Sequence, residues 1–197
     1  EAELIKLFSN AYRYINFSIS NQFYLICKNQ GLDFFKIRNF MRNNYKRNTD
    51  IPMAGFTAGP CLLKDTMQLS SFCNHRFPLF HAAMSINESL PRFIINKLNE
   101  KYNLKKKIVG VLGLSFKAEN DDIRDSLSIK LLKELKSKKI KTLQSDEYYK
   151  DKKSVDKNVL IKKSDIIIIA TPHKAYKNIK INKNKVLVDV WGLTQKY

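Results

Sequence analysis

The sequence predicts an α plus α/β protein, with a helical domain over residues 1–104 and a parallel-sheet domain over residues 105–197. Two observations support this division. In the first segment, apolar residues recur at three- and four-residue steps, which is the period of an amphipathic helix. In the second segment, short runs rich in β-branched residues alternate with helical stretches, which is typical of a parallel sheet covered by helices. The texture changes at the lysine run 105–107.

The helical half begins with a long amphipathic segment that is expected to end near Gly31. Its apolar positions are Leu4, Leu7, Phe8, Ala11, Ile15, Ile19, Phe23 and Ile26. A second helix is expected over 33–43, a short one after Asp65, and a long one over 79–101. Pro91 lies inside the last pattern, so we expect a kink or a break near Leu90.

The α/β half contains four short apolar runs that predict strands, at 108–112, 139–143, 165–170 and 186–190. Strands joined by helical stretches form a parallel sheet of the Rossmann-like kind. Ligands of such sheets bind at the carboxyl ends of the strands. Phe116 and Lys117 follow the first run directly, so we expect a ligand near them.

The most informative segment is 55–65, which places Cys61 behind a loop of small residues. Gly55, Ala58 and Gly59 carry little or no side chain, so backbone amides can approach an anionic substrate. If a helix opens here, the thiol lies at its N-terminus, where partial positive charge favours the thiolate. The alternative is that Cys61 is a small buried apolar residue.

Composition limits the class of protein. The chain has 197 residues, 44% of them hydrophobic, and no apolar run long enough to span a bilayer. Three cysteines, Cys27, Cys61 and Cys73, are odd in number and lack metal-type spacing, which favours a reducing cytoplasm and predicts no metal site. His75, His81 and His173 are scattered, so we assign them no chemistry.

The formal charge of +18 would attract polyanions. The lysines are nevertheless spread over many segments, and no nucleic-acid-binding motif accompanies them. A solvated basic surface is the preferred interpretation, with no nucleic-acid partner.

Four segments in order, 2–13, 59–65, 113–126 and 189–192, resemble motifs of the UDP-glucose/GDP-mannose dehydrogenase family. The resemblance implies NAD-dependent oxidation of a UDP-sugar C6 alcohol to a uronic acid, in the cytoplasm, for surface polysaccharides. It also implies a homodimer formed through the first long helix, and no membrane partner. Family members begin with a dinucleotide-binding domain that carries a G-x-G-x-x-G motif, which this sequence lacks. The chain is therefore expected to be a catalytically incomplete fragment, with NAD bound mainly by a domain outside it.

The resemblance also implies roles for individual residues. Cys61 would be the nucleophile that forms a thiohemiacetal and then a thioester. Lys6 and Asn10, four residues apart on one helix face, would stabilise an oxyanion, and Asp65 would position the hydrolytic water. Residues implied to bind the substrate are Gly55, Gly59, Phe116 and Lys117, and Arg124 is implied to lie near the cofactor.

Other interpretations stay open. Lys6 and Asn10 are ordinary surface residues if the resemblance is set aside, and Asp65 then serves only the start of a helix. A non-catalytic scaffold that dimerises and holds a nucleotide sugar is one rival function. A thiol hydrolase that pairs Cys61 with a histidine is another, and activity without NAD would support it.

Overall fold

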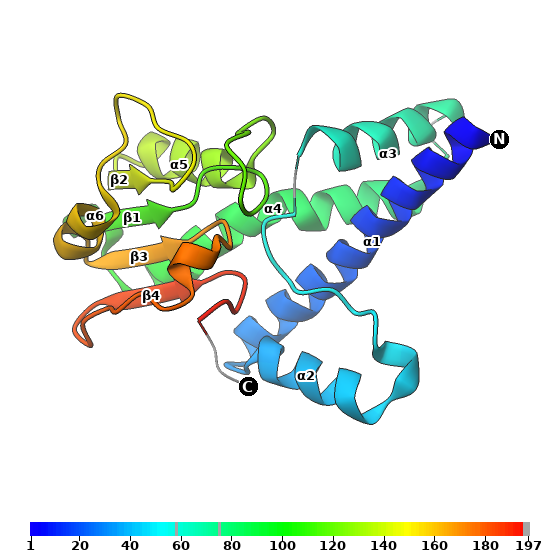
Figure 1. Cartoon of the computed structure of the whole chain (residues 1–197). Coiled ribbons are helices and arrows are strands. Elements are labelled where there is room, and N and C mark those ends of the chain that lie inside the picture. Colours follow the sequence, from blue (N-terminus) through cyan, green and yellow to red (C-terminus); the bar gives the residue numbers. More distant parts are fainter. Residues whose placement is uncertain (58, 75, 195–197) are drawn as a thin grey trace.

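In a computed structural model, the helices of the first half of the chain gather at one end of the molecule, and a parallel sheet with helices on its faces lies at the other (Figure 1). The model describes residues 1–57, 59–74 and 76–194. The α-helices are α1 (Ala2–Asn29), α2 (Phe34–Asn44), α3 (Pro60–Phe72), α4 (Pro78–Lys101), α5 (Leu127–Ser137) and α6 (Lys157–Lys163). The strands are β1 (Ile108–Leu112), β2 (Lys141–Ser145), β3 (Ile166–Ile169) and β4 (Val186–Asp189). The predicted fold class is confirmed.

Helix α1 carries two apolar stripes where the sequence suggested one. Leu7, Ala11 and Tyr14 belong to the buried stripe, which packs against α3 and α4. Leu4, Phe8, Ile19, Phe23 and Ile26 were expected on the same face but form an exposed stripe. The amphipathic helix was predicted correctly, but periodicity alone could not show which stripe the rest of the chain covers.

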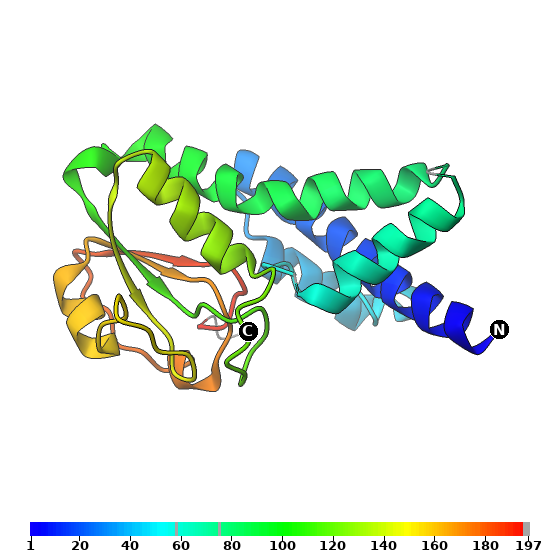
Figure 2. The ribbon, with the colours of Figure 1, turned by 90° about the horizontal axis from the view of Figure 1, so that it is seen from above.

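Helix α4 runs without interruption through Pro91, so a break near Leu90 is wrong, while a kink there stays a prediction. Proline removes the hydrogen bond to the carbonyl four residues earlier. Here Leu90, Pro91 and Ile94 are buried, and this packing offsets the lost bond. Figure 2 shows α4 extending from the helical end across one face of the sheet.

The four strands are all parallel, in the order β2-β1-β3-β4. Helices α4 and α5 lie on one face and α6 on the other (Figure 2). Successive side chains of β3 serve opposite faces: Ile166 and Ile168 pack with the α4 and α5 side, and Ile167 and Ile169 with the α6 side.

Strand β2 begins two residues later than expected because Lys139 and Ile140 form the C-terminal cap of α5. Lys139 has a φ of 58°, and the N–H of Ile140 donates to the carbonyl of Leu135 at 3.0 Å. This bond pattern is a Schellman ending, in which a left-handed residue satisfies the last carbonyls of a helix.

The predicted division into residues 1–104 and 105–197 stays a prediction. The largest apolar cluster joins both sides of that boundary, since it includes Tyr24 and Phe34 as well as Val109 and Leu131. The two halves therefore share one core.

Candidate active site at the cysteine loop

Cys61 is exposed and lies at the second position of α3. Gly59 precedes the helix with a φ of 111°, a conformation that residues with a side chain rarely adopt. Pro60 occupies the first helical position, where its missing N–H costs no hydrogen bond and its fixed φ suits the helix. The loop sequence thus sets the place where the thiol appears, and the interpretation of Cys61 as a buried residue is wrong.

Two buried asparagines hold the loop that leads to Cys61. The amide of Asn21 pairs with the backbone of Gly55: Oδ1 accepts from the N–H at 2.8 Å and Nδ2 donates to the carbonyl at 3.1 Å. Nδ2 also donates to Asn87 Oδ1 at 2.8 Å, and Asn87 donates to the Tyr14 carbonyl. Helices α1 and α4 therefore anchor the loop through fully buried amides. Neither asparagine was predicted from the sequence to belong to the site.

Two glycines allow close packing between the loop and the α/β half. A β-carbon on Gly55 would lie 2.3 Å from Trp191 Cε3, and one on Gly59 would lie 2.5 Å from Phe116 Cδ2. Both distances are far below van der Waals contact. The two glycines therefore let aromatic side chains from the carboxyl edge of the sheet pack directly on the loop.

Lys6, Asn10 and Asp65 come together between α1 and α3. Asn10 Nδ2 donates to Asp65 Oδ2 at 2.6 Å, and Lys6 Nζ lies 3.6 Å from the same oxygen. Asp65 is buried, whereas Lys6 remains largely exposed. The structure thus brings together three of the four residues predicted to act in catalysis, and Cys61 lies one helical turn before Asp65.

A cavity of about 410 Å³ opens beside Cys61. Five predicted site residues line it: Asn10, Gly59, Cys61, Phe116 and Lys117. Its walls also include Arg13, Thr57, Pro172 and Trp191, which the sequence analysis did not assign to the site. Lys6 and Asp65 lie behind Asn10, and Gly55 lies behind Trp191, so these three support the cavity without being among its lining residues.

Arg124 is exposed and is held by its neighbour Asp122, with Nη2 2.7 Å from the carboxylate. These hydrogen bonds raise the pKa of the Arg124 guanidinium and lower the pKa of the Asp122 carboxyl.

His173, to which the sequence analysis assigned no chemistry, lies fully buried at the carboxyl edge of the sheet. Its Nε2 lies 3.1 Å from Asp146 Oδ2, and its Nδ1 accepts from the N–H of Glu119 at 3.0 Å. Burial opposes the charge on Asp146, but hydrogen bonds from His173 and from backbone N–H groups, including that of Leu114, prevail and hold the pKa of this carboxyl well below its usual range. One feature of the sequence could have indicated this group: Ser115, Asp146 and His173 each follow closely after a strand.

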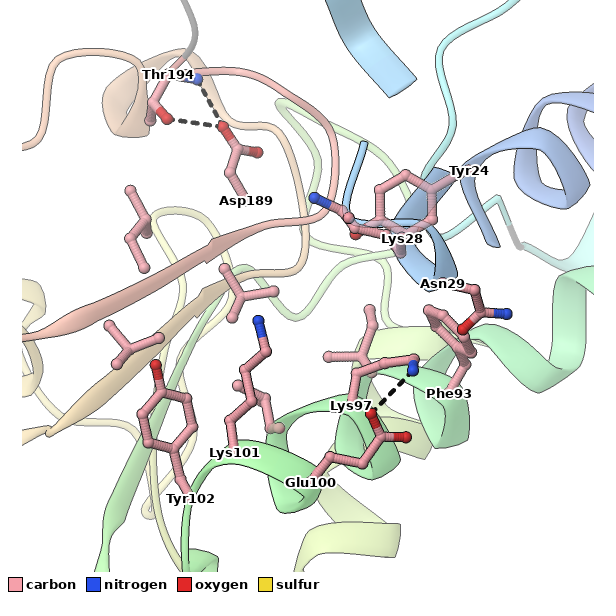
Figure 3. Close-up of a pocket in the computed structure, with 16 residues that line it drawn as sticks. Tyr24, Lys28, Asn29, Phe93, Lys97, Glu100, Lys101, Tyr102, Asp189 and Thr194 are labelled. Atoms are coloured by element: carbon pink, nitrogen blue, oxygen red, sulfur yellow. Dashed lines mark hydrogen bonds and ion pairs between the residues drawn. The ribbon is translucent and has the colours of Figure 1, made fainter. Parts of the chain in front are cut away.

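A second, larger cavity of about 550 Å³ lies between the ends of α1 and α4 and strand β4 (Figure 3). Lys28, Lys97 and Lys101 line it, and Lys97 is paired with Glu100 at 2.9 Å. It contains no cysteine and none of the predicted site residues. The cavity beside Cys61 is therefore the candidate active site.

Two residues named in the sequence analysis, Ala58 and His75, lie outside the described residues. Within the part of the chain that the structure describes, no three His, Cys, Asp or Glu side chains are grouped so that they could hold a metal ion. None of the described helices combines the length and the apolar character needed to cross a bilayer.

Comparison with known proteins matches both halves of the chain. Residues 1–89 match the central domain of the UDP-glucose/GDP-mannose dehydrogenase family, and residues 110–196 match its UDP binding domain. UDP-N-acetyl-D-mannosamine dehydrogenase of Pyrococcus horikoshii is 28% identical over 95% of this chain and 47% of its own length. The solved UDP-glucose dehydrogenase of Pyrobaculum islandicum is 27% identical, with a TM-score of 0.86 over 97% of this chain and 48% of its own.

These relatives share one class, the dehydrogenases of nucleotide sugars. The chain belongs to the UDP-glucose/GDP-mannose dehydrogenase family. It spans about half the length of the relatives that it matches.

Proposed function

We propose that this chain supplies the cysteine and the sugar-nucleotide site of an NAD-dependent UDP-sugar 6-dehydrogenase. One observation carries the proposal: exposed Cys61 shares a cavity with Asn10 from the helical half and with Phe116 and Lys117 from the end of β1. A nucleophile, a hydrogen-bonding amide and a cation thus meet at the carboxyl edge of a parallel sheet, where ligands of such sheets bind.

In the proposed reaction, the Cys61 thiolate adds to the C6 aldehyde and forms a thiohemiacetal; after oxidation, water cleaves the resulting thioester and regenerates the thiol. The amide of Asn10 faces the cavity and stabilises the oxyanion. Lys6 and Asp65 act from behind it, because Asp65 Oδ2 accepts the Asn10 hydrogen bond and Lys6 Nζ lies 3.6 Å from the same oxygen. Asp65 also positions the water through this network.

The proposed substrate is a UDP-sugar. Lys117 and Arg13 offer positive charge to a diphosphate, and the ring of Phe116 offers an apolar wall to a sugar or a base. Gly59 allows the backbone of the loop to approach the same ligand, and Gly55 serves the site by letting Trp191 pack beneath the loop. The high positive charge of the chain would help to collect this anionic substrate.

NAD would supply the acceptor for the two hydrides that leave C6. Arg124 is the residue of this chain that we propose for contact with it, since its guanidinium is exposed and lies in the segment 113–126 that resembles the family motif. The sequence has no G-x-G-x-x-G run, so we assign most of the NAD site to protein outside this chain.

The proposed assembly is a homodimer through α1, in the cytoplasm, where the product would serve surface-polysaccharide synthesis. The exposed stripe that includes Phe8, Ile19, Phe23 and Ile26 supports this assembly, because a row of large apolar side chains on one helix suits a self-complementary interface. We propose neither a nucleic-acid nor a membrane partner.

A thiol hydrolase has less support. Among the described residues no histidine is hydrogen-bonded to Cys61, and His173 is engaged with Asp146 and Glu119. Nothing in the geometry favours a non-catalytic scaffold over the enzyme, since the cysteine is exposed to the cavity.

The test is isothermal titration of the chain with UDP-N-acetylmannosamine, UDP-glucose and GDP-mannose, and separately with NAD. Selective binding of one UDP-sugar is expected, and Lys117→Ala should weaken it, whereas Lys97→Ala in the other cavity should not. Absence of binding to both this chain and a longer protein that includes an NAD domain would refute the proposal.

A further inference from the structure

Three loops meet at His173 at the carboxyl edge of the sheet. The first follows β1 and contains Ser115 and Glu119, the second follows β2 and contains Asp146, and the third contains His173 itself. His173 and Asp146 are both buried, at 0% and 5% exposure. Neither is among the residues that line the cavity beside Cys61, so any role in the site is indirect.

The hydrogen bonds fix the orientation of the imidazole. The N–H of Glu119 donates to Nδ1 at 3.0 Å, so Nε2 carries the proton in this arrangement. Nε2 lies 3.1 Å from Asp146 Oδ2 and 3.3 Å from Ser115 Oγ. Asp146 Oδ2 also accepts from the backbone N–H of Leu114 at 2.5 Å. The imidazole therefore accepts on one side and donates on the other.

The contacts of His173 hold the segment around Lys117 at two points. The Ser115 hydroxyl donates to the Lys117 carbonyl at 2.9 Å, so its oxygen is the acceptor toward His173. On the other side, Glu119 is tied to Nδ1. Thr171 fixes the start of this segment by donating to the Ser115 carbonyl at 2.7 Å. Residues 115 and 119 thus bracket Lys117, and both contact His173.

Lys117 itself has little else to hold it. Its side chain is exposed, and its Nζ lies over the ring of Phe116, 5.6 Å from the centroid. An exposed lysine on a loop loses conformational freedom when it binds a ligand, and a backbone held in advance reduces that cost.

We propose that His173 is a positioning residue for the sugar-nucleotide site, which holds residues 115–119 so that Phe116 and Lys117 face the cavity beside Cys61. This inference rests on the proposed function. A buried histidine that is distant in sequence from the cysteine loop thus contributes to binding the diphosphate of the substrate.

Two mild variants separate the two connections. His173→Gln keeps a donor for buried Asp146 and removes the acceptor for the Glu119 N–H. Ser115→Ala removes the link to the Lys117 carbonyl and leaves the histidine unchanged. Each variant is expected to weaken UDP-sugar binding by about threefold to tenfold, the range for one lost hydrogen bond. His81→Gln, at an exposed histidine of α4, is the matched control and should not change binding.

The decisive measurement is a double-mutant cycle by titration with the tightest-binding UDP-sugar. If His173 acts through Lys117, Lys117→Ala will cost much less affinity in the Ser115→Ala/His173→Gln background than in the wild type. Equal costs in both backgrounds, or unchanged affinity in both mild variants, would overturn the proposal and leave His173 a purely structural residue.

Hydrogen exchange at the Glu119 amide and trypsin cleavage after Lys117 provide a readout without substrate. Both should become faster in His173→Gln, with unchanged exchange in α5 as the internal reference. If neither this chain nor a longer protein that includes an NAD domain binds a UDP-sugar, the proposed function fails. These two rates still decide whether His173 orders the segment, and unchanged rates would contradict it.

Discussion

Trp191 packs against Gly55 so closely that no side chain fits between them, since a β-carbon on Gly55 would lie 2.3 Å from the indole. The indole is fixed in turn, because its Nε1–H donates to the Ala170 carbonyl at 2.8 Å. The cysteine loop therefore rests on a ring held by the end of β3. The geometry of the loop depends on residues more than a hundred positions away in the sequence.

Gly55→Ala should accordingly destabilise the protein by about 1–3 kcal/mol, the usual cost of overpacking. Urea unfolding measures this loss of stability. Trp191→Leu in the same background should recover part of the loss by making room. Gly55 is not among the glycines with a positive φ, so backbone strain is not part of this cost. A Gly55→Ala variant as stable as the wild type, or no recovery with Trp191→Leu, would show that the indole contact is unimportant.

Asn21→Asp should be more harmful than its small change in shape suggests. The amide Nδ2 donates to the Gly55 carbonyl and to Asn87 Oδ1, and a carboxylate would place an acceptor against both. A buried unpaired charge costs about 3–5 kcal/mol. Thermal unfolding with Asn96→Asp, at an exposed position of α4, as the control checks this expectation. Similar melting temperatures for the two variants would contradict it.

The three cysteines should differ in reactivity. Cys61 and Cys73 are exposed and Cys27 is buried, so iodoacetamide should modify the first two and spare the third. A bound UDP-sugar should protect Cys61 and leave Cys73 unprotected, because only Cys61 lines the cavity with Lys117. Peptide mass spectrometry reads all three sites in one sample. Equal protection of Cys61 and Cys73 would indicate a global effect and would weaken the assignment of the cavity.

Asp146 predicts a pH dependence with a definite sign. Its pKa is lowered in the folded protein, so between the folded and unfolded values the unfolded chain binds a proton that the folded chain does not. Stability from this group is therefore present above the unfolded pKa of about 3.9 and is lost as the pH falls through the folded value.

Asp146→Asn should flatten the dependence of the unfolding free energy on pH below about pH 4, besides lowering stability at neutral pH. Denaturant unfolding at a series of acid pH values measures the slope. Asp121→Asn, at an exposed carboxylate, is the control. A slope unchanged from the wild type would show that the pKa of Asp146 does not differ between the folded and unfolded states.

The exposed stripe of α1 gives a test of assembly. Phe8→Glu places a charge among large apolar side chains and should shift a dimer to a monomer in sedimentation experiments. Met67→Glu, at an exposed apolar residue of α3 outside the stripe, should leave the mass unchanged. A wild type that sediments as a monomer would refute the proposed dimer directly.

Periodicity and composition were enough to predict the helices and the parallel sheet, because each depends on local apolar spacing. Spacing placed Lys6 and Asn10 on one helix face, but their grouping with Asp65 followed from motif resemblance. The roles of Asn21, Asn87 and His173 were not visible, since their partners lie 27 to 73 positions away. A polar residue in a helix or after a strand looks ordinary until the tertiary contact that satisfies it is known.

Helix α4 links the stability of the two ends of the molecule. Its first turns pack Phe80 and Ala83 with Tyr14, whereas Leu90, Ile94 and Leu98 belong to the cluster that also covers the sheet. One rigid rod thus serves both ends of the molecule. Cleavage of the connection between α4 and β1 would leave each piece with an uncovered apolar face, so we expect the halves to melt in a single cooperative transition and neither to be obtained folded without the other.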